Sequence, residues 1–164
     1  MTRRLIMVVA VVMAFGAATA YAAVTVIPPS KYPPGCHPNG FAFQGDAADN
    51  NMRGDYLRDL LRGGRGRDAL HGNQGRDCLF GQRGGDLIHG AQRADRISGG
   101  RGDDRLSGGG QPDTISGGEG KDVIRDASSG ARHGNHIDCG QGFDKVVTNK
   151  QSKVAANCEH VTRR

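Results

Sequence analysis

The sequence contains no tryptophan, and its 164 residues include only 5 phenylalanines and 3 tyrosines. So few aromatic residues exclude a core built around large rings, and they argue against a surface that stacks nucleic-acid bases. Glycine is abundant instead, with 27 residues, although it offers no side chain to bury and loses much conformational entropy on ordering. A chain of this composition is either disordered or held together by something other than apolar burial.

Long hydrophobic runs are also lacking, apart from one at the N-terminus. Two arginines precede a nearly continuous aliphatic run from Leu5 to Phe15, and overlapping small-x-small cleavage sites follow at 18–20 and 20–22. The alternative is a retained membrane anchor, but the run is too short to span a bilayer comfortably. We therefore expect residues 1–22 to be a signal peptide. The mature protein is then secreted, does not insert into a membrane and lies where disulfides persist.

A period of nine residues organises the chain from residue 45 to residue 125. Each of the nine blocks begins with glycine, carries an acid or its amide at position 6, and has a large aliphatic residue at position 8. The residues at position 6 are Asn50, Asp59, Asp68, Asp77, Asp86, Asp95, Asp104, Asp113 and Asp122. Those at position 8 are Met52, Leu61, Leu70, Leu79, Ile88, Ile97, Leu106, Ile115 and Ile124.

This spacing predicts a short strand over positions 7 to 9 and a turn over positions 1 to 6, where glycines permit unusual backbone angles. Two blocks then complete one coil, and the aliphatic residues at position 8 meet between two parallel faces. One aliphatic side chain per block is too little apolar burial to offset ordering at roughly 1 kcal/mol or more per residue. The turns must therefore supply additional stabilisation.

Three blocks identify the repeat by resemblance: GGRGRDALH (63–71), GGRGDDRLS (99–107) and GGEGKDVIR (117–125). They resemble the RTX, or haemolysin-type, nonapeptide G-G-x-G-x-D-x-U-x. The tail, IDCGQGFDKVV (137–147) followed by NCEHV (157–161), is similar to the closing segment of small secreted actinobacterial proteins of this type. The resemblance implies an all-β fold, a parallel β-roll that forms a right-handed solenoid with two strands per coil, and Ca²⁺ as the bound ion.

The turn chemistry agrees with calcium. A carboxylate and turn carbonyls that recur every 18 residues on one edge supply hard oxygen ligands, which Ca²⁺ prefers. Without an ion, aspartates stacked at a strand spacing of about 4.8 Å would repel one another. The alternative is that each aspartate merely caps its own turn.

Alternate blocks share an edge, which divides the turns into two stacks. The first stack holds the turns that begin at Gly45, Gly63, Gly81, Gly99 and Gly117, and the second stack holds those that begin at Gly54, Gly72, Gly90 and Gly108. From Gly63 onward every first-stack turn has glycine at position 4. Three of the four second-stack turns lack it, and Pro112 adds a rigid backbone angle.

We therefore expect the better calcium sites in the first stack, between successive aspartates. Their residues are Asp68, Asp86, Asp104 and Asp122 with Gly64, Gly66, Gly84, Gly100, Gly102, Gly118 and Gly120. Weaker sites are expected at Asp59, Asp77, Asp95, Asp113 and Asp144.

The same register places Arg65, Arg83 and Arg101 at position 3 of successive first-stack turns, with Glu119 continuing the row. One interpretation is a solubilising surface. The other is a patch that binds an anionic polysaccharide or cell-wall polymer, and non-specific contact with nucleic acid is its weaker variant.

The four cysteines permit three pairings. We favour Cys139–Cys158, which brackets the C-terminal segment, and this leaves Cys36–Cys78 to tie the N-terminal segment to the repeats. No two cysteines are close enough in sequence to suggest metal ligation. The expected organisation is a proline-rich N-terminal cap at 23–44, the repeats at 45–125, and a loop at 126–138 followed by a cap within 126–164.

Nothing in the sequence predicts an enzyme. About 20 residues between the signal and the repeats are too few for a catalytic domain. His133 and His136 stand in a loop without an HExxH pattern, and no GxSxG occurs. We expect a secreted, calcium-binding β-roll with a structural or surface role. The alternative is a calcium-dependent module that binds anionic polymers.

Overall fold

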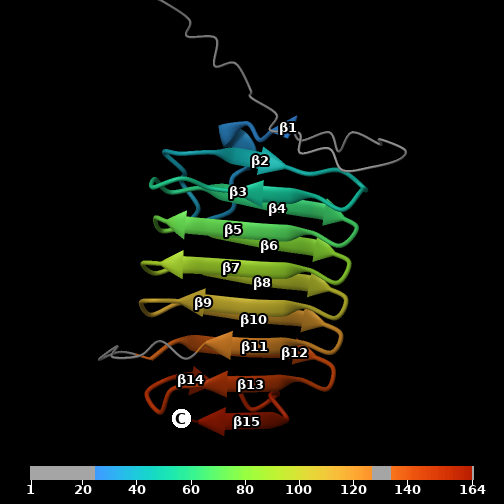
Figure 1. Ribbon diagram of the computed structural model, residues 1–164, viewed down its shortest axis with the longest axis vertical. Coiled ribbons are helices and arrows are strands. Elements are labelled where there is room, and N and C mark those ends of the chain that lie inside the picture. The colour runs from blue at the N-terminus through green and yellow to red at the C-terminus, as the bar shows by residue number, and fades with distance from the viewer. Residues whose placement is uncertain (1–24, 127–133, 164) are drawn as a thin grey trace, which may run out of the picture.

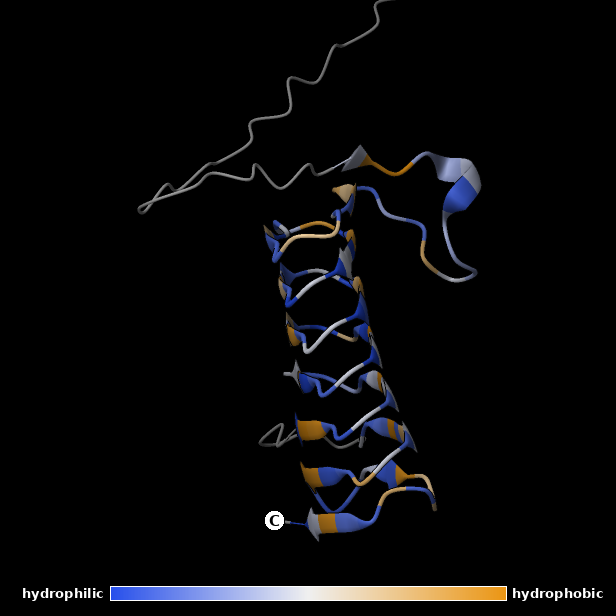
Figure 2. Cartoon of the chain, turned by 90° about the vertical axis from the view of Figure 1, so that its right-hand side faces the viewer, coloured by the Kyte–Doolittle hydropathy of each residue, from blue (hydrophilic) through white to orange (hydrophobic). Residues whose placement is uncertain are grey.

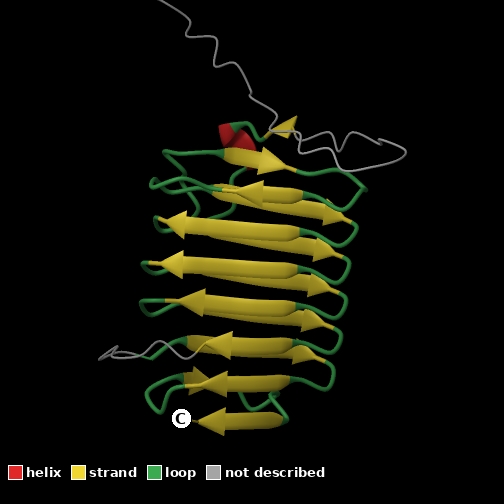
Figure 3. Ribbon diagram, viewed as in Figure 1, coloured by secondary structure: helices red, strands yellow, loops and turns green. Residues whose placement is uncertain are grey.

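The computed structural model describes residues 25–126 and 134–163, and the predicted signal peptide lies outside this part of the chain. The described chain winds into a tall stack of flattened coils (Figure 1). Within the described ranges, no helix is long and apolar enough to cross a membrane. The secondary structure is strand and turn, with one 3-10 turn, η1 (Pro29–Lys31), near the N-terminus (Figure 3).

Two sheets form the walls of the stack. The first sheet contains eight strands in the order β1-β2-β4-β6-β8-β10-β12-β14, and the second contains seven in the order β15-β13-β11-β9-β7-β5-β3. The strands of the first sheet are β1 (Thr25–Val26), β2 (Ala42–Gln44), β4 (Leu60–Arg65), β6 (Cys78–Arg83), β8 (Arg96–Arg101), β10 (Thr114–Glu119), β12 (His136–Gln141) and β14 (Lys153–Val154). Those of the second sheet are β3 (Asn51–Arg53), β5 (Ala69–Gln74), β7 (Leu87–Gln92), β9 (Arg105–Gly109), β11 (Val123–Asp126), β13 (Lys145–Thr148) and β15 (His160–Arg163).

The strands pair in parallel and in register, so that equivalent positions of the repeat lie side by side. Leu61 pairs with Leu79 and Leu79 pairs with Ile97, at a separation of two blocks. The all-β, two-strand-per-coil architecture expected from the repeat is confirmed. Only β1, which pairs with β2, runs antiparallel among the described strands.

The strands are longer than the sequence pattern predicted. Six of the nine strands from β3 to β11 contain six residues, covering positions 7 to 9 of one block and positions 1 to 3 of the next. The prediction of three-residue strands was wrong because positions 1 to 3 stay extended enough to continue the ladder. The turn is therefore confined to the residues around positions 4 to 6.

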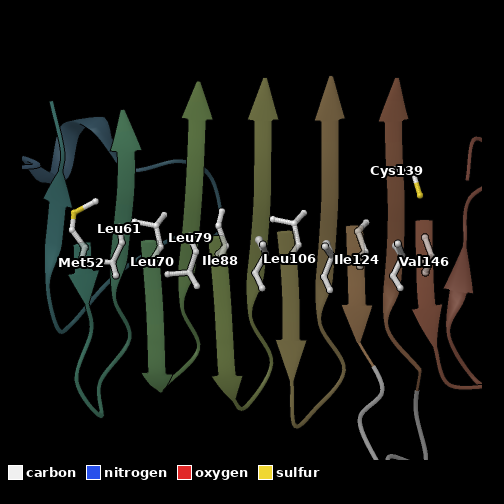
Figure 4. Packing of buried hydrophobic residues seen from close by; sticks show 12 residues of the cluster. Met52, Leu61, Leu70, Leu79, Ile88, Leu106, Ile124, Cys139 and Val146 are labelled. Atoms are coloured by element: carbon white, nitrogen blue, oxygen red, sulfur yellow. The ribbon is translucent and has the colours of Figure 1, made fainter. Parts of the chain in front are cut away.

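The interior is a single row of aliphatic side chains (Figure 4). Each residue at position 8 points inward, and all of them from Met52 to Val146 are at most 5% exposed. Phe43 pairs with Leu61 and extends this row toward the N-terminus. Because each block contributes one large side chain, the core is only one residue deep between the sheets.

A second apolar cluster covers the outer face of the first sheet near its N-terminal end. Ile27 and Cys36 pack there against Leu60 and Cys78, with Tyr32 and Phe80 at the margin. The disulfide Cys36–Cys78 pins the N-terminal segment to strand β6. In Figure 2 this segment projects from the side of the stack before it joins the first coil.

The C-terminal coil follows an insertion. Thr114 pairs with His136, a separation of 22 residues where the preceding coil has 18. The repeat register therefore resumes at Asn135 and His136, a few residues before Cys139. Residues 127–133 of the predicted loop lie outside the described residues. The disulfide Cys139–Cys158 then ties β12 to the last turn, in the pairing favoured from the sequence.

Two adjacent residues test the single-row core. Ile88 is fully buried, whereas its neighbour Leu87 is 49% exposed on the outer face. We expect Ile88→Ala to lower the free energy of unfolding by about 2–5 kcal/mol, because the cavity has no second layer of side chains to fill it. Leu87→Ala should change it by less than about 1 kcal/mol. Urea unfolding followed by circular dichroism at saturating calcium measures both, and equal losses would contradict this core.

Candidate metal centre

The aspartates at position 6 form a continuous ladder along the first stack. Each of these side chains is buried, and its Oδ1 accepts the backbone N–H of the position-6 residue one coil earlier. Asp68 N donates to Asp86 Oδ1 at 2.8 Å, and Asp86 N donates to Asp104 Oδ1 at 2.7 Å. The ladder begins at the backbone N–H of Asn50 and reaches Asp144.

The second stack carries the same ladder. Asp59 N donates to Asp77 Oδ1 at 2.9 Å, and Asp77 N donates to Asp95 Oδ1 at 2.8 Å. It continues through Asp113 to Asn135, whose Oδ1 accepts from the backbone N–H of Asp113. By this hydrogen-bond criterion, the two edges of the roll are alike.

In most of these aspartates the other carboxylate oxygen has no hydrogen-bond donor among the described residues, although Asp59 Oδ2 accepts the backbone N–H of Asp55 at 2.9 Å. In the described part of the chain, the buried Oδ2 atoms without a hydrogen-bond partner include those of Asp68, Asp77, Asp86, Asp95, Asp104, Asp122 and Asp144. A buried carboxylate that lacks a partner is costly, and it must gain either a proton or a cation. Each coil therefore adds buried carboxylates that need a proton or a bound cation.

Burial raises the pKa of these carboxyls well above the ordinary value of 3.8. The pKa rises to about 6 for Asp68 and Asp122, to about 7 for Asp77 and Asp104, and to about 8 for Asp95. Loss of solvation is the main cause, the backbone N–H bond opposes it, and neighbouring aspartates on the same ladder add repulsion. The pKa of Asp59, Asp86 and Asp144 is raised for the same main reason.

The backbone distinguishes the two stacks. In the first stack, positions 2 and 4 both adopt positive φ in every turn from residue 63 to residue 142, and all but one of these residues are glycine. Gly84 has φ of 125°, and a Cβ there would overlap the carbonyl oxygen of Gly66 in the preceding coil. Only glycine permits this close stacking of turns, so the position-4 glycines are steric requirements.

The first-stack residues with positive φ are Gly64, Gly66, Gln82, Gly84, Gly100, Gly102, Gly118, Gly120, Gly140 and Gly142. Gln82, at position 2, is the one that carries a side chain.

In the second stack, two of the four turns have positive φ at both positions. One of them uses Ala91 and Arg93, residues that adopt this region at an energetic cost. The turn from Gly108 has positive φ at Gly109 alone, and the turn from Gly54 has it at neither position. The second stack thus repeats the carboxylates of the first, but only two of its four turns repeat the backbone conformation.

The residues present fit a hard cation. The carbonyl oxygens of Gln82 and Gly84 point at the glycines of the next coil, so turn carbonyls already face the gap between neighbouring turns. The described residues contain no group of three or more histidine, cysteine or acidic side chains that would form a side-chain-only metal site. The position-6 carboxylates and the turn carbonyls together supply hard oxygen ligands, the set that Ca²⁺ prefers.

Side chains outside the nonapeptide pattern close both ladders. Ser152 Oγ accepts the backbone N–H of Asn135 at 3.1 Å, and Glu159 Oε2 accepts that of Asp144 at 2.9 Å. None of the three acceptors Asn135, Ser152 and Glu159 was predicted from the sequence. Asn135 was detectable, because it precedes His136 and Ile137 in the order of positions 6 to 8. Ser152 and Glu159 carry no periodic signal.

The arginine row predicted at position 3 is present, but its members differ. Arg65 pairs in register with Arg83, and Arg83 pairs with Arg101. Arg101 Nε lies 3.3 Å from Glu119 Oε1, the only ion pair found among residues 25–126 and 134–163. Arg65 and Arg83 are exposed and form no ion pair with the described residues.

These features define a class of protein: a parallel β-solenoid that repeats a buried carboxylate in each of its turns is a β-roll with candidate cation sites along its edges. Residues 53–88 and 89–124 each match the family model described as RTX calcium-binding nonapeptide repeat (4 copies). The repeat array of this chain belongs to that family, and calcium is the ion that its repeats bind. Neither a curated protein nor a solved structure shows significant similarity to the chain.

The raised pKa values predict an unusual pH dependence. Without calcium, the folded state holds protons that the unfolded chain releases near pH 4. The stabilisation that these bound protons give to the folded state is full below pH 4 and is lost as the pH rises through about 6 to 8. We expect the calcium-depleted protein to unfold at lower urea concentrations at pH 8 than at pH 5, and calcium affinity to rise over the same window.

Asp95→Asn is the matched variant, because asparagine already stands at position 6 in Asn50 and Asn135. It keeps the Oδ1 acceptor and removes the titrating group, so the upper part of the pH dependence should flatten. Urea midpoints that do not differ between pH 5 and pH 8 would show that the carboxylates are not buried in solution.

Proposed function

We propose that this chain is a secreted protein whose β-roll folds when it binds calcium, and that its role is structural or at the cell surface, without catalysis. The observation that carries the proposal is the row of buried Oδ2 atoms that lack a hydrogen-bond donor. At neutral pH, these carboxylates favour the folded state only when a cation compensates them.

Secretion is supported by features at both ends of the chain. The aliphatic run at 5–15 with its cleavage sites predicts export, and Cys36–Cys78 and Cys139–Cys158 are disulfides of a kind that persist outside the cytoplasm. Extracellular calcium modules typically bind at about 10⁻⁴–10⁻³ M. The roll would then stay loose before export and become ordered outside the cell.

The first stack is proposed to hold the stronger sites, between Asp68 and Asp86, Asp86 and Asp104, and Asp104 and Asp122. The in-register turn from Cys139 to Asp144 supports a further site with Asp122, since Gly140 and Gly142 have the same positive φ. The second stack, at Asp59, Asp77, Asp95 and Asp113, is proposed to bind more weakly because its turns lack the paired glycines.

A calcium titration of the mature chain followed by circular dichroism tests folding and edge preference together. We expect the β signal to grow with a midpoint near about 10⁻⁴–10⁻³ M calcium. Asp86→Asn, which touches two proposed first-stack sites, should raise the midpoint about tenfold through the loss of a charged ligand. Asp95→Asn, the same change at the equivalent place in the second stack, should raise it less than threefold on the same scale.

Reduced and disulfide-intact samples separate the effect of calcium from that of the cross-links. A β signal that stays constant from zero to about 10 mM calcium would refute calcium-driven folding, since that range exceeds typical extracellular affinities. Equal shifts from Asp86→Asn and Asp95→Asn would refute the difference between the stacks.

A second candidate function is the binding of an anionic polysaccharide or cell-wall polymer by the arginine row. The observation in its favour is that Arg65 and Arg83 project side by side without a carboxylate partner, whereas Arg101 is engaged by Glu119. Bound calcium would increase the positive charge nearby and strengthen attraction to a polyanion.

Binding of dextran sulfate over a salt series tests this second function, because the affinity of a charge-driven complex falls as the salt concentration rises. The calcium concentration is held at roughly 1 mM, the top of the expected range of calcium affinities. The double variant Arg65→Gln with Arg83→Gln should weaken binding about tenfold. The double variant Arg105→Gln with Lys145→Gln removes the same charge from the second sheet and should have little effect. Equal losses would show that net charge alone, and not the row, attracts the polymer.

A further inference from the structure

A groove of about 250 Å³ lies where the N-terminal segment crosses the second stack. One wall is formed by residues 35–38 and the Cys36–Cys78 disulfide. The other wall is formed by the ends of the second-stack turns and the first residues of the strands that follow. A groove of this size falls just below the usual range for drug-sized ligands, which suits a small polar group.

Three arginines line this groove: Arg58, Arg76 and Arg96. Arg58 and Arg76 occupy position 5 of successive second-stack turns, so they lie on neighbouring coils. Arg96 is the first residue of strand β8, and the register partner of Arg96 in strand β6 is Cys78. All three are exposed, and none has a carboxylate oxygen within ion-pair distance in the described part of the chain.

The groove also contains carboxylates, but they are recessed beneath the arginines. Asp59, Asp77 and Asp95 are only 1–3% exposed, and each turns one oxygen to a backbone N–H of the preceding coil. A ligand that enters from solvent therefore meets guanidinium groups first. Any cation bound along the ladder would neutralise the carboxylates further.

The first stack offers a contrast at the same position. There, position 5 includes acids whose side chains accept a backbone N–H one coil later: Asp49 from Arg67, and Asp103 from Lys121. The second stack has no acid at position 5, where it carries Arg58, Arg76, Ala94 and Pro112. At position 5, therefore, the second stack carries the positive charge of Arg58 and Arg76 with no acid in the same row to offset it.

The walls of the groove are held in place before any ligand arrives. Arg96 Nη1 donates to the carbonyl oxygen of Pro34 at 3.1 Å, which leaves the rest of its guanidinium fork available. Asn39 and Gly40 donate their backbone N–H to the carbonyl of Arg58, and Asn39 Oδ1 accepts the backbone N–H of Arg58 in return. With the disulfide, these contacts fix the spacing between the N-terminal segment and the coils, which lowers the ordering cost of binding.

We propose that this groove binds a tetrahedral oxyanion, as a phosphate or sulfate ester, through Arg58, Arg76 and Arg96. Guanidinium forks recognise such anions by paired N–H bonds, and their planar geometry suits a ligand held between neighbouring coils. The site is separate from the arginine row at Arg65 and Arg83, which lies on the opposite edge.

This site does not depend on calcium-driven folding, so its failure is distinguishable from failure of the proposed function. The test uses the mature, disulfide-intact chain in calcium, where it is folded under either outcome. Isotope-labelled protein is titrated with glucose 1-phosphate, and separately with sodium sulfate, while the arginine Nε–Hε and backbone amide resonances are followed. Binding to the groove predicts saturable shifts at Arg58, Arg76 and Arg96 and at the facing residues Cys36 and His37.

Arg76→Gln is the decisive variant. The side chain of Arg76 makes no hydrogen bond to the described residues, so we expect the exchange to leave the fold intact. We expect it to lower the association constant about tenfold, the loss of one charged pair of hydrogen bonds. Arg83→Gln is the matched control: the same exchange at an exposed arginine of the opposite edge, with little expected effect. Unchanged dichroism and an unchanged calcium midpoint in both variants exclude a folding defect.

The two probes distinguish the source of the anion. Binding of both indicates a site for the oxyanion itself, and tighter binding of glucose 1-phosphate indicates that the groove also accommodates the group that bears it. Shifts that do not saturate with either probe, or an equal loss of affinity in Arg76→Gln and Arg83→Gln, would overturn the proposal.

Discussion

The structure depends on how its buried carboxylates are compensated. Each position-6 aspartate satisfies one oxygen through the backbone of the preceding coil, for example Asp86 with the N–H of Asp68. That bond aligns successive coils, and in seven of these aspartates, from Asp68 to Asp144, the second oxygen is buried without a donor among the described residues. The same side chain therefore sets the register of the stack and presents a buried oxygen that a proton or a cation can compensate. The contacts between turns matter for a roll of this composition, because one aliphatic residue per block stabilises it only weakly.

If every turn had the same backbone conformation, the two edges of the roll would be equivalent. In this chain the turns of the second stack depart from the conformation of the first. Both stacks keep the aspartate ladder, so both keep the alignment of coils. Only the first stack keeps the paired glycines that let turns approach closely, as at Gly84 and Gly102. On the second stack, Ala91 and Arg93 adopt the same backbone region with side chains attached. Alignment of the coils therefore does not require the paired glycines, because the second stack keeps the aspartate ladder without them.

The ends of the array solve the problem that every solenoid has, since a terminal coil exposes its core and its unpaired backbone. At the N-terminus, strand β1 pairs with β2 at the edge of the first sheet, Phe43 extends the inner row, and the segment tied down at Cys36 covers the outer face. At the C-terminus, Ser152 and Glu159 replace the missing aspartates and accept the last free N–H groups of the ladders. The covering segment at the N-terminus also forms a groove, so one cap contributes both stability and a candidate binding site.

The sequence by itself determined the periodic part of this protein. The phase of glycine, aspartate and aliphatic residues predicted the coil, the inward row from Met52 to Ile124 and the assignment of each turn to one of two stacks. Those properties repeat along the chain, so local spacing is enough to specify them. It also favoured the observed cysteine pairs, because Cys139 and Cys158 bracket one segment.

Only the tertiary structure decided what is not periodic. The length of the strands depends on how far positions 1 to 3 stay extended against their neighbours. The coil after residue 126 contains an insertion, so Asn135 became recognisable as a ladder residue only through its contact with Asp113. The convergence of Arg58, Arg76 and Arg96 depends on where the N-terminal segment crosses the coils. Contacts between segments that follow different periods, or none, leave no pattern along the chain, and only the folded arrangement brings them together.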